Sequence, residues 1–171
     1  MFDRKLTREE LICAFKNGSK FENLNLSELN LSKANLINII LNGSNLKKTD
    51  FTRANLTGAK LNQTDLKEAI FFRTNLSVVD LKKADLRNAN LENANLSGAA
   101  DNSYQSTPRI GGADLSGADL RNANLRNANL VRVKFDYADL RGADLTGSNM
   151  TRVSLQGTKY DSNAFDKVIN V

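Results

Sequence analysis

The stretch KKADLRNANLENANLSG, residues 82–98, repeats one pattern every five residues. In each repeat a leucine follows a small residue by two places and Asn or Asp by one place, as in Ala84-Asp85-Leu86. The same period, with Leu or Phe at its centre, begins at residue 21, breaks after residue 96 and resumes at residue 115. This periodicity is the strongest structural signal in the chain.

A five-residue period fits neither an α-helix nor a flat β-strand. Five helical steps of about 100° would rotate each leucine by about 140° from the previous one, so the apolar residues would spread around the helix. In a strand, residues five apart lie on opposite faces and could not share one core. The chain is therefore expected to turn once per repeat and to wrap a coil whose central leucines all point inward.

This pattern resembles the signature of the pentapeptide repeat family over about four fifths of the chain. The full Ala-Asn/Asp-Leu triplet stands at eleven central positions, for example Ala34-Asn35-Leu36. The resemblance implies an all-β fold, a right-handed quadrilateral β-helix or solenoid with four pentapeptides and about twenty residues in each coil. Central residues of successive coils would then stack about 4.8 Å apart, which would place Phe51 directly against Phe71.

The composition of the 171-residue chain, with 40% hydrophobic and 25% charged residues, favours a single domain over residues 1–171. Its expected divisions are residues 1–18 for a short N-terminal capping α-helix, 19–98 for a first repeat block, 99–112 for an inserted surface loop, 113–167 for a second repeat block and 168–171 for the C-terminal end. The loop is expected because Leu96 and Leu115 are 19 residues apart and the only proline lies between them. Near the C-terminus, Phe165 continues the five-residue phase, but the spacing of Phe165, Val168 and Ile169 would also suit one helical turn over the last coil.

The segment LTREELICAFKNG, residues 6–18, predicts the capping helix. Thr7 is a suitable N-cap residue, and Glu10 three places later would complete a capping box. The apolar side of the helix would cover the first coil and keep its unpaired backbone groups from associating end to end. Cys13, the single cysteine, is expected to be a buried structural thiol, because the chain has no His to activate it.

No residue stands out as catalytic, cofactor-binding or metal-ligating. The chain contains no His and one Cys, and it lacks a glycine motif that could cradle phosphate. The Asn and Asp residues before the leucines suit tight turns, since their short side chains bond nearby backbone amides. The sequence has no apolar run long enough for a membrane span and no signal-like start. A non-enzymatic, cytoplasmic protein without cofactor or membrane partner is therefore expected.

Function is sought in outward-facing residues that the repeat does not require. The candidate interaction surface consists of two cationic columns, each at intervals of one coil, and three residues of the inserted loop: Lys47, Lys67 and Arg87; Lys33, Arg53 and Arg73; and Tyr104, Arg109 and Ile110. Such columns could bind a polyanion, but a net charge of only +5 and intervening acids favour solvated faces, so nucleic acid is not expected as a partner. Four apolar residues also occupy normally polar positions: Ile37, Ile40, Ile70 and Phe72. Because they fall on different sides of the coil, they are not expected to form one patch.

These observations predict a rigid scaffold or protein-interaction module with an unknown protein partner. The chain could also form a homodimer through its C-terminal coil. The family resemblance offers one alternative, because some pentapeptide repeat proteins imitate duplex DNA and bind a type II topoisomerase. A DNA mimic should be acidic, and the net charge of +5 disfavours that role. Similar proteins are plentiful in cyanobacteria, where many have no assigned activity.

Overall fold

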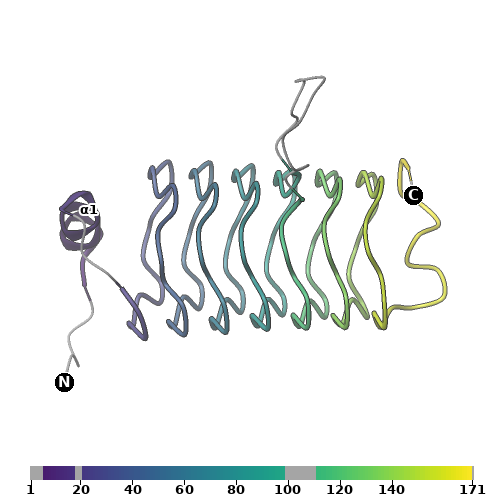
Figure 1. Ribbon diagram of the computed structural model, residues 1–171, viewed down its shortest axis with the longest axis horizontal. Helices are drawn as coiled ribbons and strands as arrows, with labels where there is room; N and C mark the ends of the chain where they lie inside the picture. The colour runs from purple at the N-terminus through teal and green to yellow at the C-terminus, as the bar shows by residue number, and fades with distance from the viewer. Residues whose placement is uncertain (1–5, 18–20, 99–110, 171) are drawn as a thin grey trace.

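A computed structural model of the protein describes residues 6–17, 21–98 and 111–170. It shows one helix followed by a long stack of coils (Figure 1). Parallel bridges join residues 20 apart, as between Asn25 and Asn45, and each coil holds four pentapeptides. The predicted coil of five-residue repeats with a short N-terminal helix is confirmed. Strand pairing within the described residues is limited to isolated bridges, because each side of the coil turns again after one bridging residue.

Neighbouring coils are joined by a recurring set of backbone hydrogen bonds. Leu31 N donates to Asp50 O at 2.7 Å, and Lys33 N donates to Thr52 O at 2.9 Å, both in the next coil. In the return direction, Asp50 N donates to Leu29 O at 2.9 Å. Because each coil pairs with backbone groups of its neighbours, a coil at either end of the stack would leave such groups unpaired.

The corners of the coil are turns whose second residue after the leucine lies in the left-handed region. Asn38 has a φ of 61° and Gly58 a φ of 68°. Asn and Gly suit this position because they adopt the left-handed conformation with little strain. The polar residue before the leucine stabilises the turn, as Asn55 Oδ1 accepts a hydrogen bond from Thr57 N at 3.1 Å. The Asn and Asp residues of the repeat therefore act as turn residues.

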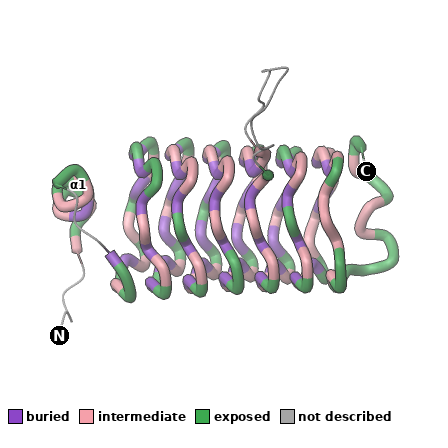
Figure 2. Tube along the Cα trace, viewed as in Figure 1, coloured by how far each residue is buried: buried purple, intermediate pink, exposed green. Residues whose placement is uncertain are grey.

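The central residues form a continuous core along the stack (Figure 2). Leu66 and its equivalents in the adjacent coils, Leu46 and Leu86, are fully buried. The rings of Phe51 and Phe71 stack with their centroids 5.1 Å apart and their planes inclined by 4°, which confirms the predicted contact. Since each coil packs only against its neighbours, stability accumulates coil by coil.

Helix α1 spans Arg8–Lys16 and lies at the N-terminal end of the stack (Figure 1). Thr7 and Glu10 make both hydrogen bonds of the predicted capping box, at 3.2 and 2.9 Å. Leu11 is fully buried in the core. The expected burial of Cys13 is wrong, because its thiol is exposed. Two residues along a helix rotate the side chain by about 200°, so Cys13 faces away from the side on which Leu11 packs.

Arg8 pairs the backbone edge that the first coil presents to the N-terminus. Its Nη1 donates to Asn30 O at 2.7 Å and its Nη2 donates to Ser32 O at 3.0 Å. One coil later, the equivalent carbonyls of Asp50 and Thr52 accept hydrogen bonds from the backbone of the coil before them. The guanidinium therefore supplies the two donors that a preceding coil would have supplied.

Backbone pairing continues across the break in the repeat. Asp80 bridges to Asp114, 34 residues along the chain instead of 20, so the chain contains fourteen additional residues between these two bridging positions. The coils on either side keep their stacking. Gly112 is required at the junction, because a Cβ there would lie 2.8 Å from backbone atoms of Arg132. Residues 99–110 of the expected loop lie outside the described residues.

The C-terminal residues cover part of the final coil without continuing the repeat. Residues 162–167 form turns, and Asn149 bridges to Asn170, 21 residues along the chain. Neither the five-residue phase nor a helical turn describes this end. Asp161 Oδ2 accepts a hydrogen bond from Gly142 N at 2.6 Å, so a carboxylate replaces the carbonyl of a further coil. The one helix in the described residues is too short and too polar to cross a membrane.

Leu66→Asp should abolish folding, because it places an uncompensated carboxylate between buried leucines at a cost of several kcal/mol. Gln63→Asp is the matched control. Gln63 is exposed and its φ of 57° suits Asp, so this change should alter the free energy of unfolding by about 0.5 kcal/mol or less. Thermal melts followed by circular dichroism measure both variants. Equal destabilisation would contradict the inward orientation of the central leucines.

Arg8→Ala should loosen the first coil selectively, because it removes two charge-assisted hydrogen bonds to backbone carbonyls. The expected loss of local stability is about 1 to 3 kcal/mol. Hydrogen exchange should therefore accelerate over residues 21–40 and stay unchanged over residues 113–150. Lys16→Ala, an exposed base in the same helix, should have little effect on either segment. Uniform acceleration along the chain would show that Arg8 does not act on the first coil.

Candidate functional site

Six of the nine residues of the predicted surface fall within the described residues. They stand in two columns on the outside of the coils: Lys47, Lys67 and Arg87; and Lys33, Arg53 and Arg73. The loop members lie outside the described residues: Tyr104, Arg109 and Ile110. The two columns differ in whether acidic residues stand beside them.

The first column is longer than the 20-residue interval predicts. Lys47, Lys67 and Arg87 are followed, one coil at a time, by Arg121 and Arg141, as the bridges beside them show. These two arginines were missed because the inserted residues change the interval from 20 to 34. The number of residues between the two repeat blocks could have predicted them, because it gives the 34-residue interval that relates one block to the other.

An acidic column runs beside this cationic column. Its members stand two residues before the bases: Asp65, Asp85, Asp119 and Asp139. Lys67 Nζ lies 3.0 Å from Asp65 Oδ2 and 3.2 Å from Asp85 Oδ2, so it links two coils. Arg87 repeats the arrangement, at 2.6 Å from Asp85 Oδ2 and 3.5 Å from Asp119 Oδ2. We call this alternating set of acids and bases the charge ladder: Asp65, Lys67, Asp85, Arg87, Asp119, Arg121, Asp139 and Arg141.

Three carboxylates of the charge ladder, those of Asp85, Asp119 and Asp139, have lowered pKa values and are therefore ionised at neutral pH. Side-chain hydrogen bonds from Arg141 lower the pKa of Asp139 to about 2. Burial raises the pKa of Asp85, but hydrogen bonds from Arg87 and other neighbours outweigh it and lower that pKa to about 2. Acidic and basic side chains therefore compensate each other along the charge ladder. This leaves little positive electrostatic potential to attract an external polyanion.

Lys47, at the end of the same column, pairs with a glutamate. Its Nζ lies 3.5 Å from Glu68 Oε1, and Lys48 Nζ lies 3.4 Å from Glu68 Oε2. All three side chains are about half exposed, and an ion pair at such sites contributes about 0 to 1 kcal/mol. Lys47 is therefore held weakly by its acidic neighbour.

The second column stands along one corner of the coil, and the name cationic corner is kept for its members Lys33, Arg53 and Arg73. All three side chains are exposed, and none forms an ion pair within the part of the chain that the structure describes. Their φ angles of 58°, 58° and 55° place them at the left-handed turn position. Arg73 Cζ lies 5.2 Å from the centroid of the Phe72 ring. This column therefore keeps its positive charge uncompensated.

Two of the four unusual apolar residues lie beside the cationic corner. Ile70 is 38% exposed and Phe72 is partly exposed, and they flank the buried Phe71 on one side of the coil. Ile37 is 40% exposed on another side, and Ile40 is partly buried. The apolar contact available next to the charges therefore comes from Ile70 and Phe72.

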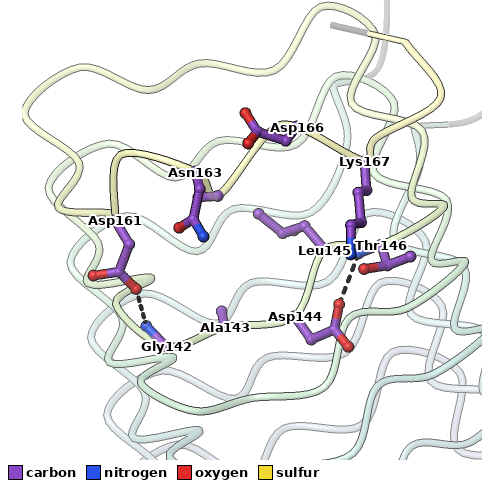
Figure 3. A pocket seen from close by; sticks show the side chains of 10 residues that line it. Gly142, Ala143, Asp144, Leu145, Thr146, Asp161, Asn163, Asp166 and Lys167 are labelled. Atoms are coloured by element: carbon purple, nitrogen blue, oxygen red, sulfur yellow. Dashed lines mark hydrogen bonds between the residues drawn. The ribbon is translucent and has the colours of Figure 1, made fainter.

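A cavity of about 310 Å³ opens where the C-terminal residues depart from the repeat (Figure 3). Its lining includes the carboxylates of Asp144, Asp161 and Asp166. Asp144 Oδ1 accepts from Thr146 N at 3.0 Å, and Asp161 Oδ2 accepts from Gly142 N, so two of the three stabilise the local backbone. The described residues contain no group of three side chains that could hold a metal ion. We attribute the cavity to the irregular end of the coil.

The sequence matches the family model described as Pentapeptide repeats, in eight copies. The matched segments are residues 17–47, 30–67, 49–88, 69–100 and 113–152. Together they cover well over half of the chain. No curated protein matches the sequence.

Several solved structures are similar to this chain. One is HetL, a pentapeptide repeat protein involved in heterocyst differentiation regulation from the cyanobacterium Nostoc sp. strain PCC 7120. HetL is 26% identical to this chain, the match covers 90% of this chain and 96% of HetL, and the TM-score is 0.35. Trypsin-treated QnrB1, a plasmid-mediated fluoroquinolone resistance protein, is 22% identical, with 85% of each chain covered and a TM-score of 0.47. Neither similarity identifies a partner for this chain.

The charge ladder predicts a loss of stability in acid. The folded pKa of Asp139 is about 2, below about 3.9 for unfolded Asp, so its contribution to stability is complete above about pH 4 and disappears as the pH falls towards 2. Arg141→Gln should flatten this part of the pH profile, whereas Arg53→Gln, which removes an unpaired base, should preserve it. Denaturant unfolding between about pH 2 and pH 5 measures the effect. Identical profiles for the two variants would disprove the stabilising role of the pair.

Proposed function

Because this chain belongs to the pentapeptide repeat family, we propose that it is a non-enzymatic, rigid scaffold that binds a protein partner. The coil is then the right-handed quadrilateral β-helix that the family resemblance implies. Backbone bridges in every coil hold the outward side chains at fixed positions. A surface of this kind loses little conformational entropy when a partner binds.

The observation that carries this proposal is the charge ladder. Lys67 and Arg87 each contact acids of two successive coils, so these bases stabilise the stack itself. Of the two predicted columns, the cationic corner is the one whose bases form no ion pair with any residue that the structure describes. A rigid surface that combines the compensated charge ladder with the unpaired cationic corner suits selective recognition of a complementary protein surface.

The acidic residues support a non-catalytic role. Asp119 Oδ1 accepts a hydrogen bond from Arg121 N at 3.2 Å, and Asn124 makes the same turn bond to Arg126 N at 3.0 Å. Asp and Asn thus make the same turn bond in different repeats, so a structural role accounts for the Asp residues. A carboxyl group with a pKa near 2, such as that of Asp139, is also a poor general acid or base at neutral pH.

A DNA mimic that binds a type II topoisomerase remains the alternative that the family resemblance raises. Such a mimic needs a continuous acidic surface. In the charge ladder each Asp stands next to a base, and the net charge of the chain is +5. The charge pattern therefore supports the scaffold over the mimic.

Two further expectations stay predictions: a homodimer through the C-terminal coil and a cytoplasmic location. Tyr160 and Ile169 near the C-terminus are 46% and 67% exposed, and a dimer at this end would bury them. Sedimentation equilibrium of the purified protein measures the oligomeric state.

A topoisomerase supercoiling assay, run beside a duplex-binding titration, tests the proposed function. We expect no inhibition at low micromolar protein, and weak duplex binding that vanishes near physiological salt, because few phosphate contacts can form. Chemical crosslinking in the native cytosol should instead capture a protein in stoichiometric amounts. Potent inhibition, or duplex binding that persists at physiological salt, would overturn the proposal.

A further inference from the structure

We infer that the cationic corner binds an acidic helical segment of a protein partner. The inference rests on the proposed scaffold function and adds to it the binding surface and the chemistry of the partner. The segment carries carboxylates at positions i, i+3 and i+7, opposite Lys33, Arg53 and Arg73. Its helix axis runs along the stack of coils.

The bases of the cationic corner have no acidic partner in residues 6–17, 21–98 and 111–170. In the charge ladder, Arg87 contacts two carboxylates, whereas Arg53 and Arg73 contact none among the described residues. A guanidinium group is planar and binds a carboxylate through two parallel hydrogen bonds. An acidic partner would therefore supply carboxylates to the bases of the cationic corner, as the neighbouring Asp column does for the bases of the charge ladder.

The spacing of the corner matches one face of an α-helix. Equivalent residues in successive coils lie about 4.8 Å apart, so Lys33 and Arg73 are separated by about 9.6 Å. Along a helix, residues i+3 and i+7 lie about 4.5 Å and about 10.5 Å beyond residue i and share its face. In an extended strand, side chains on one face recur only every 6.8 Å or so. Three carboxylates on one face of a helix can therefore each pair with one base of the corner. The side-chain spacing of a strand matches the corner less closely.

A row of amide donors adjoins the corner. Asn55 and Asn75 follow Arg53 and Arg73 by two residues, with one buried residue between, so these side chains share the outside of the coil. The Oδ1 atom of each Asn already accepts two hydrogen bonds from the residue two places on. Their Nδ2 groups donate to no described residue. The surface beside the bases is therefore rich in donors and favours an anionic ligand.

Apolar side chains border the same strip. Phe72 and Ile70 are partly exposed, and Arg73 lies over the Phe72 ring. An amphipathic helix carries apolar residues beside its polar stripe. Such a helix could place carboxylates on the cationic corner and an apolar residue against Phe72 at the same time.

A nucleic acid fits this surface less well. Asp50 and Glu92 stand on the side of the coil that adjoins the corner, and neither pairs with Arg53 or Arg73. They would repel a uniformly negative backbone, whereas a helix can present a neutral or basic residue to them.

The test uses the purified full chain and two alanine-rich, helix-stabilised peptides of about fifteen residues. The first peptide carries Glu at i, i+3 and i+7 beside one Leu, and the second has the same composition with the Glu residues on different faces. Nuclear magnetic resonance titrations follow the isotope-labelled protein. We expect saturable shifts at residues 33, 53, 72 and 73 with the first peptide, and binding of the second peptide that is weaker by about fivefold or more.

Arg53→Asn combined with Arg73→Asn is the decisive variant. Asn occupies the same turn position in the two coils that follow, with φ angles of 57° and 54°, so the backbone should be unaffected. Lys83→Asn combined with Arg152→Asn is the matched control, because it removes two exposed bases from left-handed positions, with φ of 57° and 60°, elsewhere on the coil. The first pair should weaken binding of the first peptide about tenfold or more, and the control pair by less than about twofold.

Equal affinity for the two peptides, or equal losses in the two double variants, would overturn the inference. So would tighter binding of a single-stranded oligonucleotide at the same corner in physiological salt, which would identify a nucleic-acid site. Circular dichroism confirms that each variant is folded. Because this assay uses a defined probe, its failure would leave the scaffold proposal intact, and that proposal is decided by the supercoiling and duplex-binding assays.

Discussion

The stack of coils depends on backbone hydrogen bonds between one coil and the next. A central residue such as Leu31 donates to a carbonyl of the following coil, and this bond sets both the distance and the register between coils. Register then places like residues above one another, with Phe51 over Phe71 and leucine over leucine. A slip by one residue would disrupt every column at once. The stack therefore tolerates varied outward residues but few inward ones.

Stacking of like residues also brings like charges close together, so the bases of a column repel one another. The two cationic columns differ in whether acidic residues offset this repulsion. In the charge ladder, a neighbouring Asp column compensates the bases, and each of Lys67 and Arg87 joins two coils. In the cationic corner, Lys33, Arg53 and Arg73 stand in successive coils about 4.8 Å apart and repel one another, and none of them pairs with an acid among the described residues. A local arrangement that costs stability without structural compensation is a sign of a function for that part of the surface.

The sequence predicted the coil, the capping box and the contact between Phe51 and Phe71, because each depends on a short motif or a fixed period. It did not predict the exposure of Cys13, since this depends on which side of the helix packs. The pairing of Lys67 with two Asp residues also escaped prediction, because a period defines positions along a column but not the lateral reach of side chains between columns. The C-terminal residues follow no period, so only the structure shows how they cover the last coil.

The two ends of the stack are chemically different. In each repeat, the side of a coil that faces the N-terminus offers two carbonyl acceptors and one N–H donor, and the opposite side offers two donors and one acceptor. At the N-terminal end, Arg8 contributes two donors to the carbonyls of the first coil. At the C-terminal end, Asp161 contributes an acceptor to an N–H group of the final coil. Each uncapped end is thus complementary to the other end and not to itself. Chains stripped of these caps would add to one another head to tail, as an open filament with a direction of growth, instead of closing into a symmetric pair.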